Sequence, residues 1–183
     1  MYGLLVLLVV ALFIFLSALF SGAENAFFSL NPNDLVLLNE ENSRQSNVAL
    51  ELINEPDRKT ATRRLLATIL LMNNLVNIFI VIFTSTMFEY LFNTEVIGGP
   101  LTFAIQVVLI TFILVLLGEV IPKIYATQNN LRIIRLMASP LKWSYILFKP
   151  LILLLAGTSS VFDRFINKSN HNISVEELSQ AID

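Results

Sequence analysis

The sequence predicts an all-α integral membrane protein with three transmembrane helices and amphipathic juxtamembrane helices. Of its 183 residues, 55% are hydrophobic and 14% are charged, which is more apolar surface than a soluble core of this size can bury. No Lys or Arg occurs between Arg64 and Lys123. Two successive membrane spans joined by a short outer loop leave such a gap, so we expect the chain to lie in a lipid bilayer.

Composition and motifs exclude several function classes. The formal net charge is −2 and no stretch forms a basic stripe, so nucleic acid is excluded as a partner, because phosphate neutralisation requires clustered Lys and Arg. The chain has no cysteine, which excludes disulfides, thiolate metal sites and cysteine nucleophiles. The single histidine, His171, lies in a polar tail, and neither H-E-x-x-H nor G-x-S-x-G is present. We therefore expect the protein not to be an enzyme.

The first predicted span covers about residues 2–24. Residues 2–20 are uncharged, and as a helix they would measure roughly 28 Å, close to the thickness of a bilayer's hydrocarbon core. A cleavable signal peptide is the alternative, but the stretch lacks a basic start and is longer than the roughly 7–15 apolar residues of such signals. Residues 31–56 are more polar and predict one or two amphipathic helices at the membrane surface.

The second and third predicted spans cover about residues 65–88 and 101–121. The connection between them carries two Glu, no cation and the breaker Gly98-Gly99-Pro100, which is typical of an outer turn. Lys and Arg precede the second span and follow the third, where cytoplasmic segments carry them. We therefore expect a multi-pass protein of the plasma (inner) membrane, with its N-terminus outside and its C-terminus in the cytoplasm.

The segment 143–162 is apolar but is interrupted by Lys149-Pro150. An interfacial helix pair, kinked at Pro150 and lying along the inner leaflet, is favoured over a fourth span because it lets the lysines reach water. Juxtamembrane helices are thus predicted over about 132–166. We assign residues 1–168 to a transmembrane transport domain and 169–183 to the start of a linker to a cytoplasmic domain, since a Ser-capped helix begins at Ser174 and stops at Asp183.

Three groups of polar residues fall inside the predicted spans, where a central charge costs about 2.5–3.5 kcal/mol on insertion scales. They are Ser17, Ser21 and either Glu24 or Asn25 on one face of the first span; Asn73, Asn74 and Asn77 in the second; and Gly118, Glu119, Pro122 and Lys123 at the end of the third. In the third group, Gly118 and Pro122 would permit a local break that frees backbone carbonyls. Because of that cost, we expect the three groups to face one another.

The polar groups supply hard oxygen ligands, which suit Mg²⁺ or Ca²⁺ and not Zn²⁺ or Cu⁺. Each group also has a plainer interpretation. Serines in membrane helices permit close packing, and the asparagines could hydrogen-bond between helices. Glu24 and Glu119 could be ordinary charges at the water boundary. The combination favours a divalent-cation transport module, and the alternatives are a Mg²⁺-permeable channel and a non-transporting membrane scaffold or sensor.

Three motifs resemble those of the transmembrane domain of the CorC/CNNM family of Mg²⁺ transporters, and the resemblance extends over about residues 5–180. They are F-S-G-A-E-N-A at residues 20–26, L-L-M-N-N-L-V-N-I at 70–78 and G-E-V-I-P-K at 118–123. The resemblance implies three spans with a belt of juxtamembrane helices, a homodimer, and cytoplasmic nucleotide-binding CBS domains after this region. It also implies Mg²⁺ efflux, with Na⁺ entry as the possible driving force.

The resemblance also implies an ion site. Carried over residue by residue, the Mg²⁺ ligands fall on Ser17, Ser21, Asn73, the Gly118 backbone carbonyl and Glu119. Possible neighbours, or a site for the coupling ion, are Glu24, Asn74, Asn77, Pro122 and Lys123. Ala23 stands where bacterial members carry a second serine, which leaves Ser21 as the hydroxyl of this motif.

Overall fold

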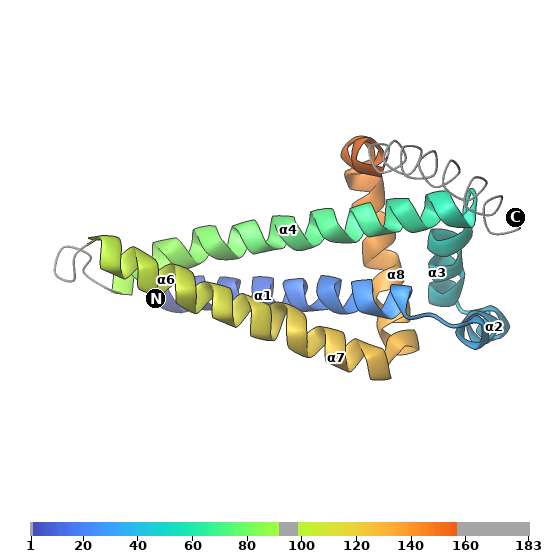
Figure 1. Cartoon of the computed structure of the whole chain (residues 1–183), viewed down its shortest axis with the longest axis horizontal. Helices are drawn as coiled ribbons and strands as arrows, with labels where there is room; N and C mark the ends of the chain where they lie inside the picture. The colour runs from blue at the N-terminus through green and yellow to red at the C-terminus, as the bar shows by residue number, and fades with distance from the viewer. Residues whose placement is uncertain (1, 92–98, 157–183) are drawn as a thin grey trace, which may run out of the picture.

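The computed structural model describes residues 2–91 and 99–156, and within them every regular element is a helix. Three helices are long and apolar enough to cross a membrane: Gly3–Phe28, Arg58–Ser85 and Phe103–Gln128. They belong to α1 (Tyr2–Phe28), to α4 (Arg58–Leu91), and to a continuous run of α6 (Gly99–Ile113), η1 (Leu114–Val120) and α7 (Ile121–Gln128). Figure 1 shows the three lying alongside one another, which confirms the predicted all-α membrane fold.

The helices extend beyond the apolar runs that predicted them. α1 continues to Phe28, α4 begins at Arg58 and α7 ends at Gln128, because a helix keeps its own backbone hydrogen bonds where it leaves the apolar layer. Asp57 caps the start of α4, and its carboxylate accepts a hydrogen bond from the Thr60 backbone N–H at 3.0 Å. That bond holds the pKa of Asp57 below its usual value.

Two short helices follow α1, as the sequence allowed. In α2 (Pro32–Glu41), Asn31 and Asp34 form a reciprocal capping box, and the helix ends at Asn42 with a φ of 46° in the left-handed region. In α3 (Arg44–Asn54), the Ser43 hydroxyl caps the first turn. Figure 1 shows both helices at the end of the bundle where α4 begins.

α8 (Asn130–Leu147) runs across the long helices in Figure 1, the direction expected of a helix lying along a membrane surface. A second helix, Lys149–Ala156, follows it at a bend of 91°. The bend falls at Phe148 and not at Pro150, because a proline in the first turn of a helix sacrifices no hydrogen bond. This geometry supports an interfacial pair over a straight fourth span. The predicted continuation to residue 166, and the linker at 169–183, lie outside the described residues.

The core lies where α1 meets the other helices. Small residues bring α1 close to α7: a Cβ added to Gly22 would lie 3.5 Å from the Pro122 carbonyl oxygen and 3.8 Å from the Ala126 Cβ. On α8, Ile134, Ala138 and Leu141 are fully buried. The outer faces of the spans stay apolar and exposed, as lipid contact requires.

Candidate functional site

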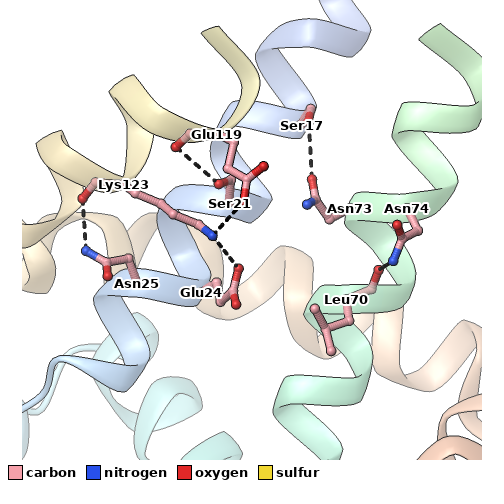
Figure 2. Close-up of polar contacts among 9 residues, drawn as sticks. All are labelled: Ser17, Ser21, Glu24, Asn25, Leu70, Asn73, Asn74, Glu119 and Lys123. Atoms are coloured by element: carbon pink, nitrogen blue, oxygen red, sulfur yellow. Dashed lines mark hydrogen bonds and ion pairs between the residues drawn. The ribbon is translucent and has the colours of Figure 1, made fainter. Parts of the chain in front are cut away.

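The polar side chains of α1 point at the other two spans. Ser17 and Ser21 are 2% and 0% exposed. The Ser17 hydroxyl oxygen lies 2.8 Å from the Asn77 amide oxygen and 3.2 Å from the Asn73 amide oxygen, both on α4. Figure 2 shows Ser17 directed at Asn73. A hydroxyl has one proton and can donate it fully to only one of these oxygens, so two amide oxygens share one donor here. We refer to Ser17, Asn73 and Asn77 as the Ser17 group.

The third span meets this group with its backbone. A Cβ added to Gly118 would lie 3.1 Å from the Ser17 hydroxyl oxygen, which is tighter than an ordinary contact, so a larger residue here would push the Ser17 side chain aside. One residue on, the Glu119 carbonyl oxygen lies 3.5 Å from the Ser21 hydroxyl, at the limit of a hydrogen bond. Ser17 is thus a point at which all three spans meet, and Ser21 links α1 to the third span.

The local break expected at Gly118 and Pro122 is a π-helical segment instead. η1 (Leu114–Val120) continues directly into α7, and the backbone at Val120 and Ile121 keeps right-handed helical angles. A π-helical turn widens the helix without interrupting it and is frequent at functional sites. Pro122 has no N–H, so it cannot donate the α-helical bond that the Gly118 carbonyl would otherwise accept.

Three charged side chains lie beside this group, toward the C-terminal end of α1. The Lys123 Nζ lies 2.9 Å from a Glu119 carboxylate oxygen and 3.3 Å from a Glu24 carboxylate oxygen. Figure 2 shows the lysine between the two carboxylates, linking α1 to the third span. The Glu119 side chain is half exposed at 50%, and its carboxylate is bound by this lysine. Glu119 thus faces the group through its carbonyl and faces Lys123 through its carboxylate.

Asn25 also bonds across to the third span. Its amide nitrogen donates to the Lys123 carbonyl at 2.9 Å and to the Thr127 hydroxyl at 2.8 Å. The sequence left open whether Glu24 or Asn25 would share the face of Ser17. In the structure both contact the third span, Glu24 through the Lys123 ammonium and Asn25 through the Lys123 carbonyl and the Thr127 hydroxyl. Thr127 was not predicted, although its four-residue spacing from Lys123 is a signal that could have indicated it.

Asn74 is not brought to the group. It is exposed, and its amide nitrogen donates to the Leu70 carbonyl of its own helix at 2.8 Å, as Figure 2 shows. Consecutive residues of an α-helix point about 100° apart, so Asn73 and Asn74 cannot both face α1. Asn74 instead lines a separate cavity of about 370 Å³ that also contacts Leu155.

On the N-terminal side of Ser17, α1 contacts α4 through apolar side chains. Phe13, one turn before Ser17, stacks on Phe79 and Phe83 of α4 with ring centroids 5.3 and 5.6 Å apart. Farther along, the Gln106 amide donates to the Ser85 hydroxyl at 2.7 Å and links α6 to α4. This pair was not predicted, although a lone Gln in an apolar run was a usable signal.

The group contains few charges. Across residues 2–91 and 99–156, no three His, Cys, Asp or Glu side chains come together. The oxygens that converge are hydroxyls, amides and backbone carbonyls, with Glu24 and Glu119 beside them. Such a set can ligate a hard cation and could balance its charge with at most those two carboxylates.

Comparisons with known proteins give a matching family and a curated relative. The family model of the cyclin M (CNNM) transmembrane N-terminal domain matches residues 7–183. A UPF0053 protein of Haemophilus influenzae is 33% identical over 114 residues, which cover 62% of this chain and 24% of that protein. The match thus spans about a quarter of the length of this curated relative.

Proposed function

This chain belongs to the cyclin M transmembrane-domain family, and we propose that it transports Mg²⁺ through an ion site between its three spans. The observation that carries the proposal is the meeting of Ser17 with Asn73 and Asn77 of α4 and with the Gly118 backbone of the third span. The membership and the membrane fold support a metal-ion transporter. The choice of Mg²⁺ rests on the chemistry of these oxygens and on the resemblance of the motifs.

Mg²⁺ requires a near-octahedral set of oxygens at about 2.0–2.1 Å and gives up its water reluctantly. We propose that Ser17, Ser21, Asn73, the Gly118 carbonyl and Glu119 supply these oxygens, with Asn77 as an additional amide. The Asn73 and Asn77 amide oxygens and the Glu119 carbonyl oxygen already lie within 3.5 Å of Ser17 or Ser21, so a small movement would bring them to a shared cation.

We propose that Lys123 balances the two carboxylates whenever no cation is bound. Its ammonium lies between Glu24 and Glu119, so an incoming cation must compete with it for Glu119. Once displaced, the lysine would add a positive charge beside the site and favour release of the ion. This exchange would keep the total charge among these residues small in both states, which matters in a medium of low dielectric constant.

The finer features of transport are also proposals. We propose efflux across the plasma membrane, with Na⁺ entry as the driving force, in a homodimer regulated by CBS domains of the full-length chain. The N-terminus would lie outside and the basic end of α4 inside, because Arg58, Lys59 and Arg64 gather there.

Flux through liposomes tests the proposal. The protein is reconstituted with a Mg²⁺-sensitive dye inside, and Mg²⁺ movement is followed with and without an opposing Na⁺ gradient. We expect Mg²⁺ flux that depends on the Na⁺ gradient and falls at least tenfold in Asn73→Ala, while the neighbouring Asn74→Ala keeps the wild-type rate. Flux without dependence on Na⁺ would indicate a channel, and equal loss of flux in both variants would contradict the assigned site.

A further inference from the structure

A second cavity lies away from the Ser17 group, at the basic end of α4. Its volume is about 560 Å³, and α3, α4 and α8 form its walls. Pockets for small molecules commonly measure about 300–1,000 Å³, so this cavity can hold an ordered ligand. None of the residues assigned to ion transport lines it.

The floor of this cavity is apolar. Ala61 and Leu65 of α4 are 2% and 5% exposed, and Leu141 of α8 is fully buried. The Thr68 hydroxyl at the floor donates to the Arg64 carbonyl at 2.7 Å, so its proton is not available to a ligand. The floor is therefore mainly apolar and favours a hydrocarbon chain.

The rim of the same cavity is charged but balanced. Two of its charges, Glu51 and Lys142, form an ion pair with each other. The other two are the Arg64 guanidinium and the Glu55 carboxylate. Neither lies within ion-pair distance of an opposite charge in the described part of the chain, although Arg64 is near enough to Asp57 to lower the pKa of that carboxyl. One open cation and one open anion match a ligand that carries both charges, whereas a purely basic rim would match an anionic headgroup.

The cavity also borders an exposed apolar surface of α8. Ile146 lines it while being 56% exposed, and on the same helix Trp143 and Leu147 are 74% and 73% exposed. An exposed tryptophan beside aliphatic residues is typical of the interface between headgroups and acyl chains. A bilayer lipid could therefore reach this cavity directly from its own leaflet.

We propose that this cavity binds a zwitterionic phospholipid with a primary amine, such as phosphatidylethanolamine. Arg64 binds the phosphate, Glu55 binds the ammonium, and one acyl chain lies on the floor formed by Ala61, Leu65 and Leu141. An ammonium with three N–H donors pairs with a carboxylate, which the trimethylammonium of phosphatidylcholine cannot do by hydrogen bonding. The lipid would tie α3 and α8 to the start of α4.

Lipid retention tests this proposal. The detergent-purified protein is incubated with phosphatidylethanolamine, phosphatidylcholine and phosphatidylglycerol of identical acyl chains, and bound lipid is counted by native mass spectrometry. We expect phosphatidylethanolamine to be retained at least fivefold more than either other lipid and to raise the melting temperature selectively. Arg64→Gln should lower its retention severalfold, and Glu55→Gln should reduce it to the level of phosphatidylcholine.

Matched variants separate this site from general effects and from transport. Lys59→Gln and Glu40→Gln remove exposed charges of the same kind outside the cavity and should leave the lipid preference unchanged. Asn73→Ala should also keep the lipid preference. Loss of the ion site can therefore be distinguished from loss of the lipid site. Equal retention of the three lipids, a preference for phosphatidylglycerol, or a preference that survives both rim substitutions would overturn the proposal.

Discussion

The two halves of the three-span bundle are built differently. In the polar half, residues 17–28 of α1 present Ser17, Ser21 and Asn25 at four-residue spacing, and each contacts another span through a polar atom. In the apolar half, residues 3–16 of α1 contain no polar side chain, and Phe13 stacks on α4. One helix thus provides both the polar face that we propose as the ion site and an apolar contact surface on the N-terminal side of Ser17.

The largest expected effect on Mg²⁺ affinity comes from disturbing the polar half where α1 and the third span approach most closely. In Gly118→Ala the new Cβ would lie 3.1 Å from the Ser17 hydroxyl oxygen, so Ser17 must move away from Asn73 and Asn77. We expect Mg²⁺ affinity to fall at least tenfold, or about 1.4 kcal/mol, as measured by titration calorimetry. Gly22→Ala is the control, because its Cβ would meet its nearest neighbour at an ordinary 3.5 Å. Equal losses in the two variants would mean that packing, and not ligation, is affected.

A smaller effect concerns the charges beside the polar half. Lys123→Gln leaves Glu24 and Glu119 without their shared cation, so both carboxylates become available to a metal ion. Partly exposed ion pairs are worth about 0.2–1 kcal/mol each, so we expect Mg²⁺ to bind up to about fivefold more tightly. Titration of the variant beside Lys59→Gln checks this expectation. Weaker binding in Lys123→Gln would contradict competition between the lysine and the ion.

The apolar half can be tested by removing one ring. Phe13→Ala deletes two stacked contacts with α4, each worth about 0.5–1.5 kcal/mol beyond burial, and should lower the free energy of unfolding accordingly. Phe15→Ala is the matched control, since Phe15 is 59% exposed on the same helix. Mg²⁺ affinity should change less than twofold in either variant, because neither ring contributes an oxygen. A loss of affinity as large as that of Gly118→Ala would show that the two halves do not act separately.

The smallest effect lies outside both halves, at the start of α4. Because its folded pKa is lowered, Asp57 adds stability that is fully present above the usual carboxyl pKa of 3.8 and is lost as the pH falls through the folded value. Asp57→Asn keeps the capping oxygen and removes this titration. The melting temperature should therefore fall slightly less steeply between pH 6 and pH 3 in the variant than in the wild-type protein. A steeper fall in the variant would contradict the lowered pKa.

The three spans could be predicted from the sequence because an uncharged apolar run long enough to cross a bilayer is typical of a transmembrane helix. It predicted their ends less well, since caps such as Asp57 extend a helix beyond the apolar layer. The polar residues were identifiable by their cost in lipid, but which of Asn73 and Asn74 faces α1 depends on how α4 is rotated about its axis. The pairing of Lys123 with Glu24 and the π-helical turn depend likewise on the register between helices far apart in the chain.

The central claim is that Ser17 and Asn73 form part of a Mg²⁺ site in the folded protein. Thermal unfolding of the detergent-purified protein over a Mg²⁺ series, with Ca²⁺ and Na⁺ as controls, tests it most directly. A ligand present at 100 times its dissociation constant stabilises the folded state by about 2.7 kcal/mol, so a clear rise in melting temperature is expected. The account predicts that Asn73→Ala loses this rise and that Asn74→Ala keeps it. A rise retained in full by Asn73→Ala, or no rise in the wild-type protein, would contradict the account.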